Sequence, residues 1–457
     1  MSGIEIIGVI SILIIGGVFY MLFNWLSKNS KRRSIFNFKR DHEEATYKEP
    51  YKSEINSKEF IFIGHSVSKK RVLMENDAKH VFICGTTGSG KTVALSNFIK
   101  SGADYNYPML IIDGKGDTNV GSLLDITKKL CPERKLYVIN LNDPSSSDKY
   151  NPFKNTNTDV IKDMLINMTT WSEDHYKYNA ERYIQRLLKL MALNEIDISL
   201  ASIVRYLLID NFNELSKDLS VKELITKEER LEDSELAKIS GKIAEGAAAR
   251  FAVIKESSLG QIFDSSGIDI YTALEENAII LFILNPLLYP EMSPLIGNLI
   301  IIDSKKAVSN FYRNKKNRIF YILDEINVYA SNSLLDLVNK SRSANITCIL
   351  ATQSLSDLDS VNEQFKEQVI ENCNNYIALR QNSAINADAW ANIFGTKVSM
   401  QPTYQIKDGV STDLGSLRKT REFIYHPDDI KTLRLGKAIF LSRDTAEHTK
   451  VNVIKPF

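Results

Sequence analysis

The chain has 457 residues, a length that predicts two or three domains. Hydrophobic residues make up 44% and charged residues 25% of the total, as is typical of a globular protein with a sizeable core. The formal net charge of +1 excludes a uniformly basic nucleic-acid coat, and four cysteines without a CxxC pair argue against a disulfide framework or a zinc site.

A membrane anchor is predicted at the N-terminus, where residues 6–26 read IIGVISILIIGGVFYMLFNWL and carry no charge. As a helix, this stretch would span roughly 30 Å, the thickness of a bilayer core. A cleaved signal peptide is the alternative, but the basic start and the small-residue cleavage site of such a peptide are missing.

Basic residues gather after this stretch, whereas Glu5 precedes it. The positive-inside rule therefore predicts an outer N-terminus and the bulk of the chain in the cytoplasm. We expect a single-pass protein of the cell membrane, with the anchor in residues 1–26 and a polar linker in residues 27–58.

A glycine-rich stretch after the apolar run at residues 80–84 predicts a phosphate-binding loop, because GTTGSGKT fits the pattern G-x-x-x-x-G-K-[ST]. Its residues are Gly85, Thr86, Thr87, Gly88, Ser89, Gly90, Lys91 and Thr92. Apolar residues follow at helical spacing, so the loop would join a strand to a helix N-terminus, which favours phosphate. We expect Lys91 to reach the β- and γ-phosphates of ATP and Thr92 to hold Mg²⁺. A structural glycine turn is the alternative.

Apolar runs at residues 109–114 and 135–141 predict two further strands. The first run continues as DGKGD, so Asp113, Lys115 and Asp117 would lie on the rim that carries the phosphate loop. An Asp-Gly turn is the competing explanation for this stretch.

Residues 156–265 show amphipathic helical patterns and hardly a strand pattern. They predict an all-α domain inserted into the nucleotide-binding domain. The two parts of the nucleotide-binding domain would then be residues 59–155 and residues 266–457.

A basic run precedes the next predicted strand, and it consists of Lys305, Lys306, Arg313, Lys315, Lys316 and Arg318. Such a run is more often a solvated face than a contact with DNA, and both interpretations stay open.

Residues 318–325, RIFYILDE, predict a buried strand that ends in two carboxylates. Asp324 would hold Mg²⁺ through water, and Glu325 would polarise the attacking water; a solvated strand end is the alternative. The next apolar run, ITCILATQS, ends in Gln353 at the edge of a parallel sheet where ligands bind. Gln353 would therefore sense the γ-phosphate, unless it only caps the strand.

Strand-like and helical patterns alternate along most of the chain, which indicates a parallel α/β sheet. The remaining expected strands are residues 60–64, 278–284 and 376–380 and two closing strands in residues 436–457.

The order of GTTGSGKT, IIDGKGD, YNPF (residues 150–153), the helical insert, ILDE and SRSANITCILATQSLSDL resembles that of the type IV coupling proteins. These are membrane-anchored ATPases of conjugation and type IV secretion. The resemblance covers roughly residues 60–457. It implies a RecA-like P-loop NTPase with a parallel-rich central sheet, an inserted all-α domain and one N-terminal transmembrane helix. Many relatives have two transmembrane helices where this sequence predicts one.

The same resemblance implies ATP and Mg²⁺ as ligands and a homo-hexameric ring at the membrane. It implies partners as well: single-stranded DNA with its relaxase complex, and a type IV secretion channel. In ring ATPases of this type, an arginine of one subunit often reaches the γ-phosphate of its neighbour. The matching stretch makes Arg342 the candidate and Arg380 the second choice; a surface arginine at a helix end is the alternative.

Other functions remain open at this point. A septal-type or archaeal-type translocase of double-stranded DNA would use the same motor. An ATPase that feeds protein to a secretion system, or a nucleotide-gated membrane scaffold, would share the anchor and the loop. ATP hydrolysis follows from the residues themselves, whereas DNA transfer rests on the resemblance.

Overall fold

The computed structural model describes residues 46–168, 171–313, 318–359, 364–407 and 410–457, together with Met21 and Trp25. The chain divides into two units, Met1–Tyr47 and Lys48–Phe457, and all elements below belong to the second. The predicted anchor lies outside the described residues except for Met21 and Trp25, and so does the predicted linker up to residue 45. Within the described ranges, no helix combines the length and the apolar character needed to cross a bilayer.

A parallel-rich sheet organises the second unit, as predicted. Seven neighbouring strands run parallel in the order β9-β3-β8-β7-β4-β6-β5 among the described residues. Most of their residues are buried, because helices cover the sheet, and this is why the sequence shows continuous apolar runs. The strands are β3 (Val81–Cys84), β4 (Met109–Asp113), β5 (Leu136–Asn140), β6 (Ile279–Ile283), β7 (Ile319–Asp324), β8 (Ile346–Thr352) and β9 (Asn375–Ala378).

Four antiparallel strands extend the sheet beyond β9, in the order β2-β1-β13-β12. They are β1 (Phe60–Ser66), β2 (Arg71–Glu75), β12 (Lys437–Ser442) and β13 (Glu447–Val453). The sequence predicted β1 and both closing strands but missed β2. Buried and more exposed residues largely alternate in β1 and β2, as in one-sided antiparallel strands joined by a tight turn.

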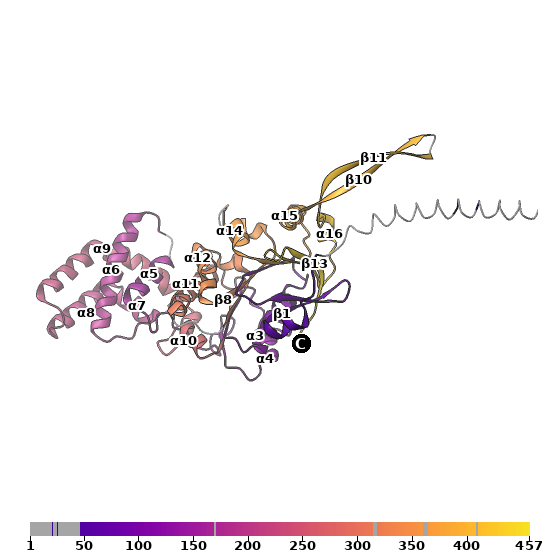
Figure 1. Ribbon diagram of the computed structural model, residues 1–457. Helices are drawn as coiled ribbons and strands as arrows, with labels where there is room; N and C mark the ends of the chain where they lie inside the picture. The colour runs from indigo at the N-terminus through magenta and orange to yellow at the C-terminus, as the bar shows by residue number, and fades with distance from the viewer. Residues whose placement is uncertain are drawn as a thin grey trace, which may run out of the picture. The chain divides into compact units, whose positions relative to one another are not determined.

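A second, two-stranded sheet consists of β10 (Thr396–Lys407) and β11 (Val410–Phe423), which pair with each other among the described residues. It is the yellow hairpin of Figure 1. The sequence analysis predicted no strand there.

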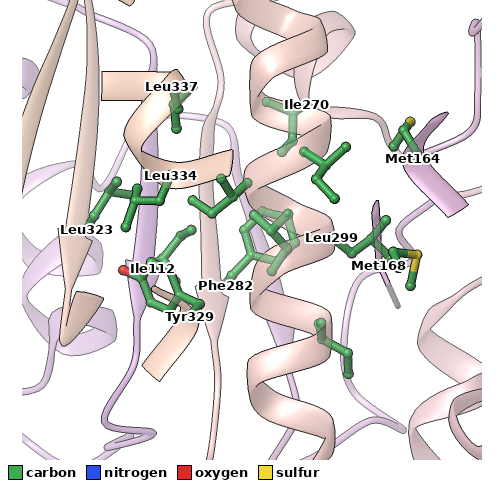
Figure 2. Close-up of a cluster of buried hydrophobic side chains, with 14 of the residues drawn as sticks. Ile112, Met164, Met168, Ile270, Phe282, Leu299, Leu323, Tyr329, Leu334 and Leu337 are labelled. Carbon is green, nitrogen blue, oxygen red and sulfur yellow. The ribbon is translucent and has the colours of Figure 1, made fainter. Parts of the chain in front are cut away.

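Helices connect and cover the parallel strands. They are α2 (Lys52–Ser57), α3 (Lys91–Asp104), α4 (Leu123–Leu130), α10 (Ile270–Glu275), α11 (Met292–Arg313), α12 (Asn332–Ser341), α13 (Ser356–Asp359), α14 (Phe365–Asn372), α15 (Ala384–Phe394) and α16 (Pro427–Lys431). Ile112, Phe282 and Leu323 of three parallel strands gather with Leu299 of α11 in one buried cluster (Figure 2). Met164 of the helical insert joins the same cluster, so the insert shares its core with the sheet domain.

The described regular structure between residues 158 and 262 is helical. It consists of α5 (Thr158–Asn167), α6 (Asp174–Leu193), α7 (Leu200–Tyr206), α8 (Ile209–Val221), α9 (Lys227–Glu256) and the 3-10 turn η2 (Ser258–Ile262). Tyr183 stacks on Phe212 with ring centroids 4.4 Å apart. The buried Asp233 of α9 accepts hydrogen bonds from Arg186 Nε and Ser216 Oγ, both at 2.6 Å. These polar contacts fix the register of α9 against α6 and α8.

A buried polar cluster lies where the chain enters the helical insert. Tyr150 donates its hydroxyl to Asp303 at 2.8 Å, and Lys306 pairs with the other oxygen of Asp303 at 2.8 Å. Lys305 pairs with Asp336 at 2.8 Å. The two lysines of the predicted basic run therefore hold elements of this chain together and do not form a free basic patch.

Candidate active site

The predicted phosphate loop lies between β3 and α3, at the edge of the sheet where the parallel strands end. Gly88 and Gly90 have φ angles of +74° and +111°, which favour glycine. A side chain at Gly85 would place its Cβ 2.6 Å from Leu379 Cβ, so this position also requires glycine. The loop precedes a fourteen-residue helix whose N-terminus supplies unpaired N–H groups for an anion.

Two backbone segments that the sequence analysis did not connect with the loop hold it in place. Thr86 donates its N–H to the carbonyl of Arg380 at 3.1 Å, directly after β9. Gly436, at the start of β12, donates its N–H to the carbonyl of Ser89 at 3.1 Å. Any residue type can make a backbone hydrogen bond, so the sequence does not indicate these contacts. The order of the strands in the sheet brings these segments together.

Lys91, Glu325, Gln353 and Thr87 form a continuous chain of polar contacts. Lys91 Nζ lies 2.5 Å from Glu325 Oε1, and Gln353 Nε2 donates to the same oxygen at 3.0 Å. Thr87 Oγ1 in turn donates to Gln353 Oε1 at 3.0 Å. The sheet order explains this meeting, because β8 lies between β3 and β7 and brings Gln353 between the loop and the carboxylates.

Three carboxylates lie at the same edge. Asp113 and Asp324 are register partners at the ends of the adjacent strands β4 and β7, and Glu325 follows directly. Burial raises the pKa of Asp324 to about 7. The nearby Lys91 opposes this increase, whereas the negative charges of Glu325 and Asp113 add to it. Burial also raises the pKa of Asp113 to about 6, against the N–H groups of Lys115 and Gly116 that donate to its carboxylate.

Glu325 has a left-handed backbone, with φ +49° and ψ +54°, which is uncommon for a glutamate. It turns the chain from β7 into the 3-10 helix η3 (Ile326–Tyr329). A Cβ on Gly114 would lie 2.8 Å from the carbonyl oxygen of Asp324, so Gly114 permits the close approach of β4 to this turn. The turn aims the Glu325 side chain at Lys91, whereas Asp324 stays within the strand.

The residues fit a nucleotide with a divalent cation. Ser89 Oγ and Asp324 Oδ1 are buried without a hydrogen-bond partner among the described residues. Thr92 is half-buried next to Lys91. Carboxylate and hydroxyl oxygens are the ligands that Mg²⁺ prefers, and a cation would offset the cost of burying Asp324 and Asp113 as anions.

The remaining predicted residues differ in their position relative to the phosphate loop. Arg342 is exposed in the 3-10 turn η4 (Arg342–Ala344), at the start of β8, whereas Gln353 follows the end of the same strand. The structure therefore does not bring Arg342 to the phosphate loop of its own chain. Arg380 lies beside the loop through its carbonyl. Asp117 binds Asn119 within its own turn.

A family model for the type IV secretion-system coupling protein DNA-binding domain matches residues 71–454. Among curated proteins, an uncharacterized protein of Mycoplasma pneumoniae is 29% identical over 105 residues, which cover 23% of this chain and 70% of that protein. A second uncharacterized protein of that organism is 31% identical over 93 residues, covering 17% of this chain and 78% of that protein.

Solved structures share the fold at low sequence identity. The unbound monoclinic form of the bacterial conjugative coupling protein TrwB is similar with a TM-score of 0.63 and 17% identity, covering 86% of this chain and 88% of that chain. TrwB in complex with ADP and Mg²⁺ gives a TM-score of 0.59, 16% identity and coverages of 84% and 88%. VirB4 of Thermoanaerobacter pseudethanolicus gives a TM-score of 0.54, 10% identity and coverages of 86% and 96%.

Proposed function

The chain belongs to the family of type IV secretion-system coupling proteins, and we propose that it is a P-loop ATPase that drives DNA transfer in conjugation or type IV secretion. The contact chain from Lys91 through Glu325 and Gln353 to Thr87 is the observation that carries the catalytic half of this proposal. In this chain of contacts, the amide of Gln353 bridges the carboxylate of Glu325 and Thr87 of the phosphate loop. Nucleotide hydrolysis needs such a loop to bind phosphate and such a carboxylate to activate water.

ATP would bind with its phosphates on the N–H groups of residues 85–92. Lys91 would exchange its partner Glu325 for the β- and γ-phosphates, since an ammonium group beside an anionic phosphate is favourable in a buried site. Thr92 and Asp324 would hold Mg²⁺, which when bound would neutralise charge on the phosphates. The N–H groups at the start of α3 would add to the stabilisation of the phosphate anion.

Glu325 would orient and polarise the attacking water once Lys91 has left it. Gln353 contacts both Glu325 and Thr87 of the phosphate loop, so it is suited to sense whether a γ-phosphate is present. Binding and hydrolysis would thereby change the contacts at the end of β8. β8 begins next to the turn that carries Arg342, at the opposite edge of the sheet. A shift of β8 caused by the nucleotide would therefore also move Arg342.

We further propose that the DNA is single-stranded and arrives with a relaxase, that the protein works as a hexamer, and that residues 1–26 anchor it in the membrane. Family membership supports these partners, and the apolar run of residues 6–26 supports the anchor. The hexamer would place Arg342 of one subunit at the γ-phosphate of the next.

The function can be tested with the full chain purified in detergent. ATP hydrolysis would be measured without DNA, with a single strand and with a duplex of the same sequence. We expect the single strand to stimulate hydrolysis more strongly than the duplex, and Lys91→Ala to abolish both activities. Stimulation by duplex alone would favour a double-stranded DNA translocase, and no response to either DNA would favour a protein-secretion ATPase.

A further inference from the structure

The β10–β11 hairpin has no role in the site described above. Its two strands pair from Thr396 opposite Phe423 to Lys407 opposite Val410, with one shift of register between Tyr404 and Ile406. Its base is well anchored: Ile424 donates its N–H to the carbonyl of Gly395 at 3.0 Å, and the hydroxyl of the buried Tyr425 lies 3.0 Å from His448 Nδ1. The hairpin is thus an arm with a fixed base (Figure 1).

Positive charge is concentrated in β11. Arg418, Lys419 and Arg421 are three basic residues among four, and all three side chains are exposed. Their nearest acidic neighbour along β11, Glu422, already accepts a hydrogen bond from Gln401 Nε2 at 2.6 Å. The register sets Lys419 opposite Met400 and Arg421 opposite Val398, so these two basic residues share one face.

Apolar side chains accompany the basic ones. Val398 is 51% exposed, Met400 39% and Leu417 63%, although solvent exposure of large apolar groups is unfavourable. A nucleic-acid strand has anionic phosphates, and its bases and sugars offer apolar surface. Exposed cations beside exposed apolar side chains are therefore complementary to such a strand.

We propose that the β10–β11 hairpin is an arm that binds single-stranded DNA on one face, with Lys419 and Arg421 on the phosphates and Val398, Met400 and Leu417 of the same face against sugars and bases. Residues two apart on one face of a strand are separated by roughly 7 Å. Neighbouring phosphates of an extended single strand have a comparable spacing, so Lys419 and Arg421 suit consecutive phosphates. This inference rests on the proposed function, because it assigns DNA contacts to a protein that transfers DNA.

The arm is connected to the nucleotide site by a short path along the chain. β11 ends at Phe423, the short helix α16 follows, and the next turn reaches Gly436, whose N–H donates to Ser89 of the phosphate loop. Gly436 has a φ of +72°, and a Cβ on Gly90 would lie 3.4 Å from its Cα, so the two backbones are closely packed. DNA held by the arm would therefore be coupled to the loop that binds ATP.

The test compares two double variants of the full chain in detergent. Lys419→Ala and Arg421→Ala remove the cations of the proposed face of the arm. Lys238→Ala and Lys242→Ala remove the same charge from exposed positions of α9. Affinity for a fluorescein-labelled oligothymidine would be measured by anisotropy over a series of salt concentrations, and DNA-independent ATPase activity would report folding.

We expect the arm variant to lose at least tenfold in affinity at low salt. Each phosphate contact with a single strand contributes about 0.7 to the slope of log affinity against log salt, so two lost contacts should reduce the slope by about 1.4. The α9 variant should keep the wild-type slope, and Arg421→Lys, which preserves the charge, should keep most of the wild-type affinity. DNA-independent hydrolysis should be equal in all of these proteins.

An arm variant with the wild-type slope and affinity would overturn the inference while leaving the proposed function intact. The inference would also fail if the arm variant lost self-association in sedimentation but kept its slope, since the hairpin would then contact another copy of the chain. If the wild-type chain itself did not bind the oligonucleotide, the proposed function would fail as well.

Discussion

Glu325 combines an uncommon backbone conformation with a buried side chain that binds Lys91. A left-handed non-glycine residue costs of order 1 kcal/mol, and such strain persists mainly where the fold imposes it. Here the imposed turn separates two adjacent carboxylates, so that Asp324 stays in the strand and Glu325 faces the phosphate loop.

Glu325→Gln should keep ATP binding and lose turnover. Glutamine preserves the shape of the side chain but cannot polarise water, so we expect the hydrolysis rate to fall by about 100-fold or more. Binding of a fluorescent ATP analogue and steady-state hydrolysis would be measured on the same preparation, with the exposed Glu235→Gln as a matched control. Hydrolysis at the wild-type rate would show that Glu325 has a different role.

Arg342 should act on the nucleotide of a neighbouring subunit if it acts at all, because it lies at the opposite end of β8 from Gln353. Arg342→Ala and Lys91→Ala should each be nearly inactive alone. Mixed subunits should regain activity, since an intact loop of one can meet the intact arginine of the other. If Arg342→Ala alone were fully active, Arg342 would have no role in hydrolysis. If mixing the two inactive variants restored no activity although subunits exchange, Arg342 would act within its own subunit.

The side chains that the sequence proposes for the site each lie in a short contiguous stretch, GTTGSGKT, ILDE or ATQ, with its own chemistry. The structure brings Lys91, Glu325 and Gln353 from these three stretches into contact. The carbonyl of Arg380 and the N–H of Gly436 were missed as partners of the loop, because a backbone group carries no residue-specific signal. The direct contact between Lys91 and Glu325 also depends on the sheet order, which local patterns do not determine.

At the scale of elements, buried parallel strands were predicted well, since burial on both faces demands continuous apolar runs. β2 was missed because it has only five residues, of which Arg71 and Glu75 at the two ends are charged, so its apolar run is three residues long. The β10–β11 hairpin was missed because β11 is mostly polar, although Val398, Met400, Tyr404 and Ile406 stand at alternate positions of β10. The strand pattern reflects burial, and the described side chains of this hairpin are largely exposed.

His80, just before β3, ties three elements together and should make stability depend on pH. Its Nε2 lies 2.8 Å from the carbonyl of Val338, and its Nδ1 accepts the N–H of Cys348 at 3.1 Å, which requires a neutral ring. Burial, assisted by the nearby Arg342, lowers the pKa of His80 to about 4. Protonation therefore favours the unfolded chain, where the pKa is near its ordinary value.

The folded-state pKa is depressed, so the contribution of His80 to stability is present above about pH 6.5 and is lost as the pH falls toward 4. At about 1.4 kcal/mol for each of the 2.5 pH units between these two pKa values, the loss should amount to roughly 3 kcal/mol. Denaturant unfolding at several pH values would measure it, with His80→Gln as the comparison. If the free energy of unfolding fell equally in both proteins over this range, His80 would not be the titrating group.

At the scale of the whole molecule, the unit from Lys48 onward has its own extensive core. Removal of residues 1–26 should therefore leave a soluble, folded ATPase. Ring formation should weaken, because tethering in a bilayer raises the effective concentration of subunits. Circular dichroism and sedimentation velocity would test both expectations. An insoluble, unfolded truncated chain would contradict the separation of anchor and ATPase.

Displacement of streptavidin from the end of a biotinylated single strand tests most directly whether ATP hydrolysis moves DNA. The full chain in detergent should release streptavidin with ATP, but not with a non-hydrolysable analogue, and Glu325→Gln should bind the strand without releasing it. A wild-type chain that binds the strand and hydrolyses ATP but leaves streptavidin in place would contradict the account of this protein as a DNA-transferring motor.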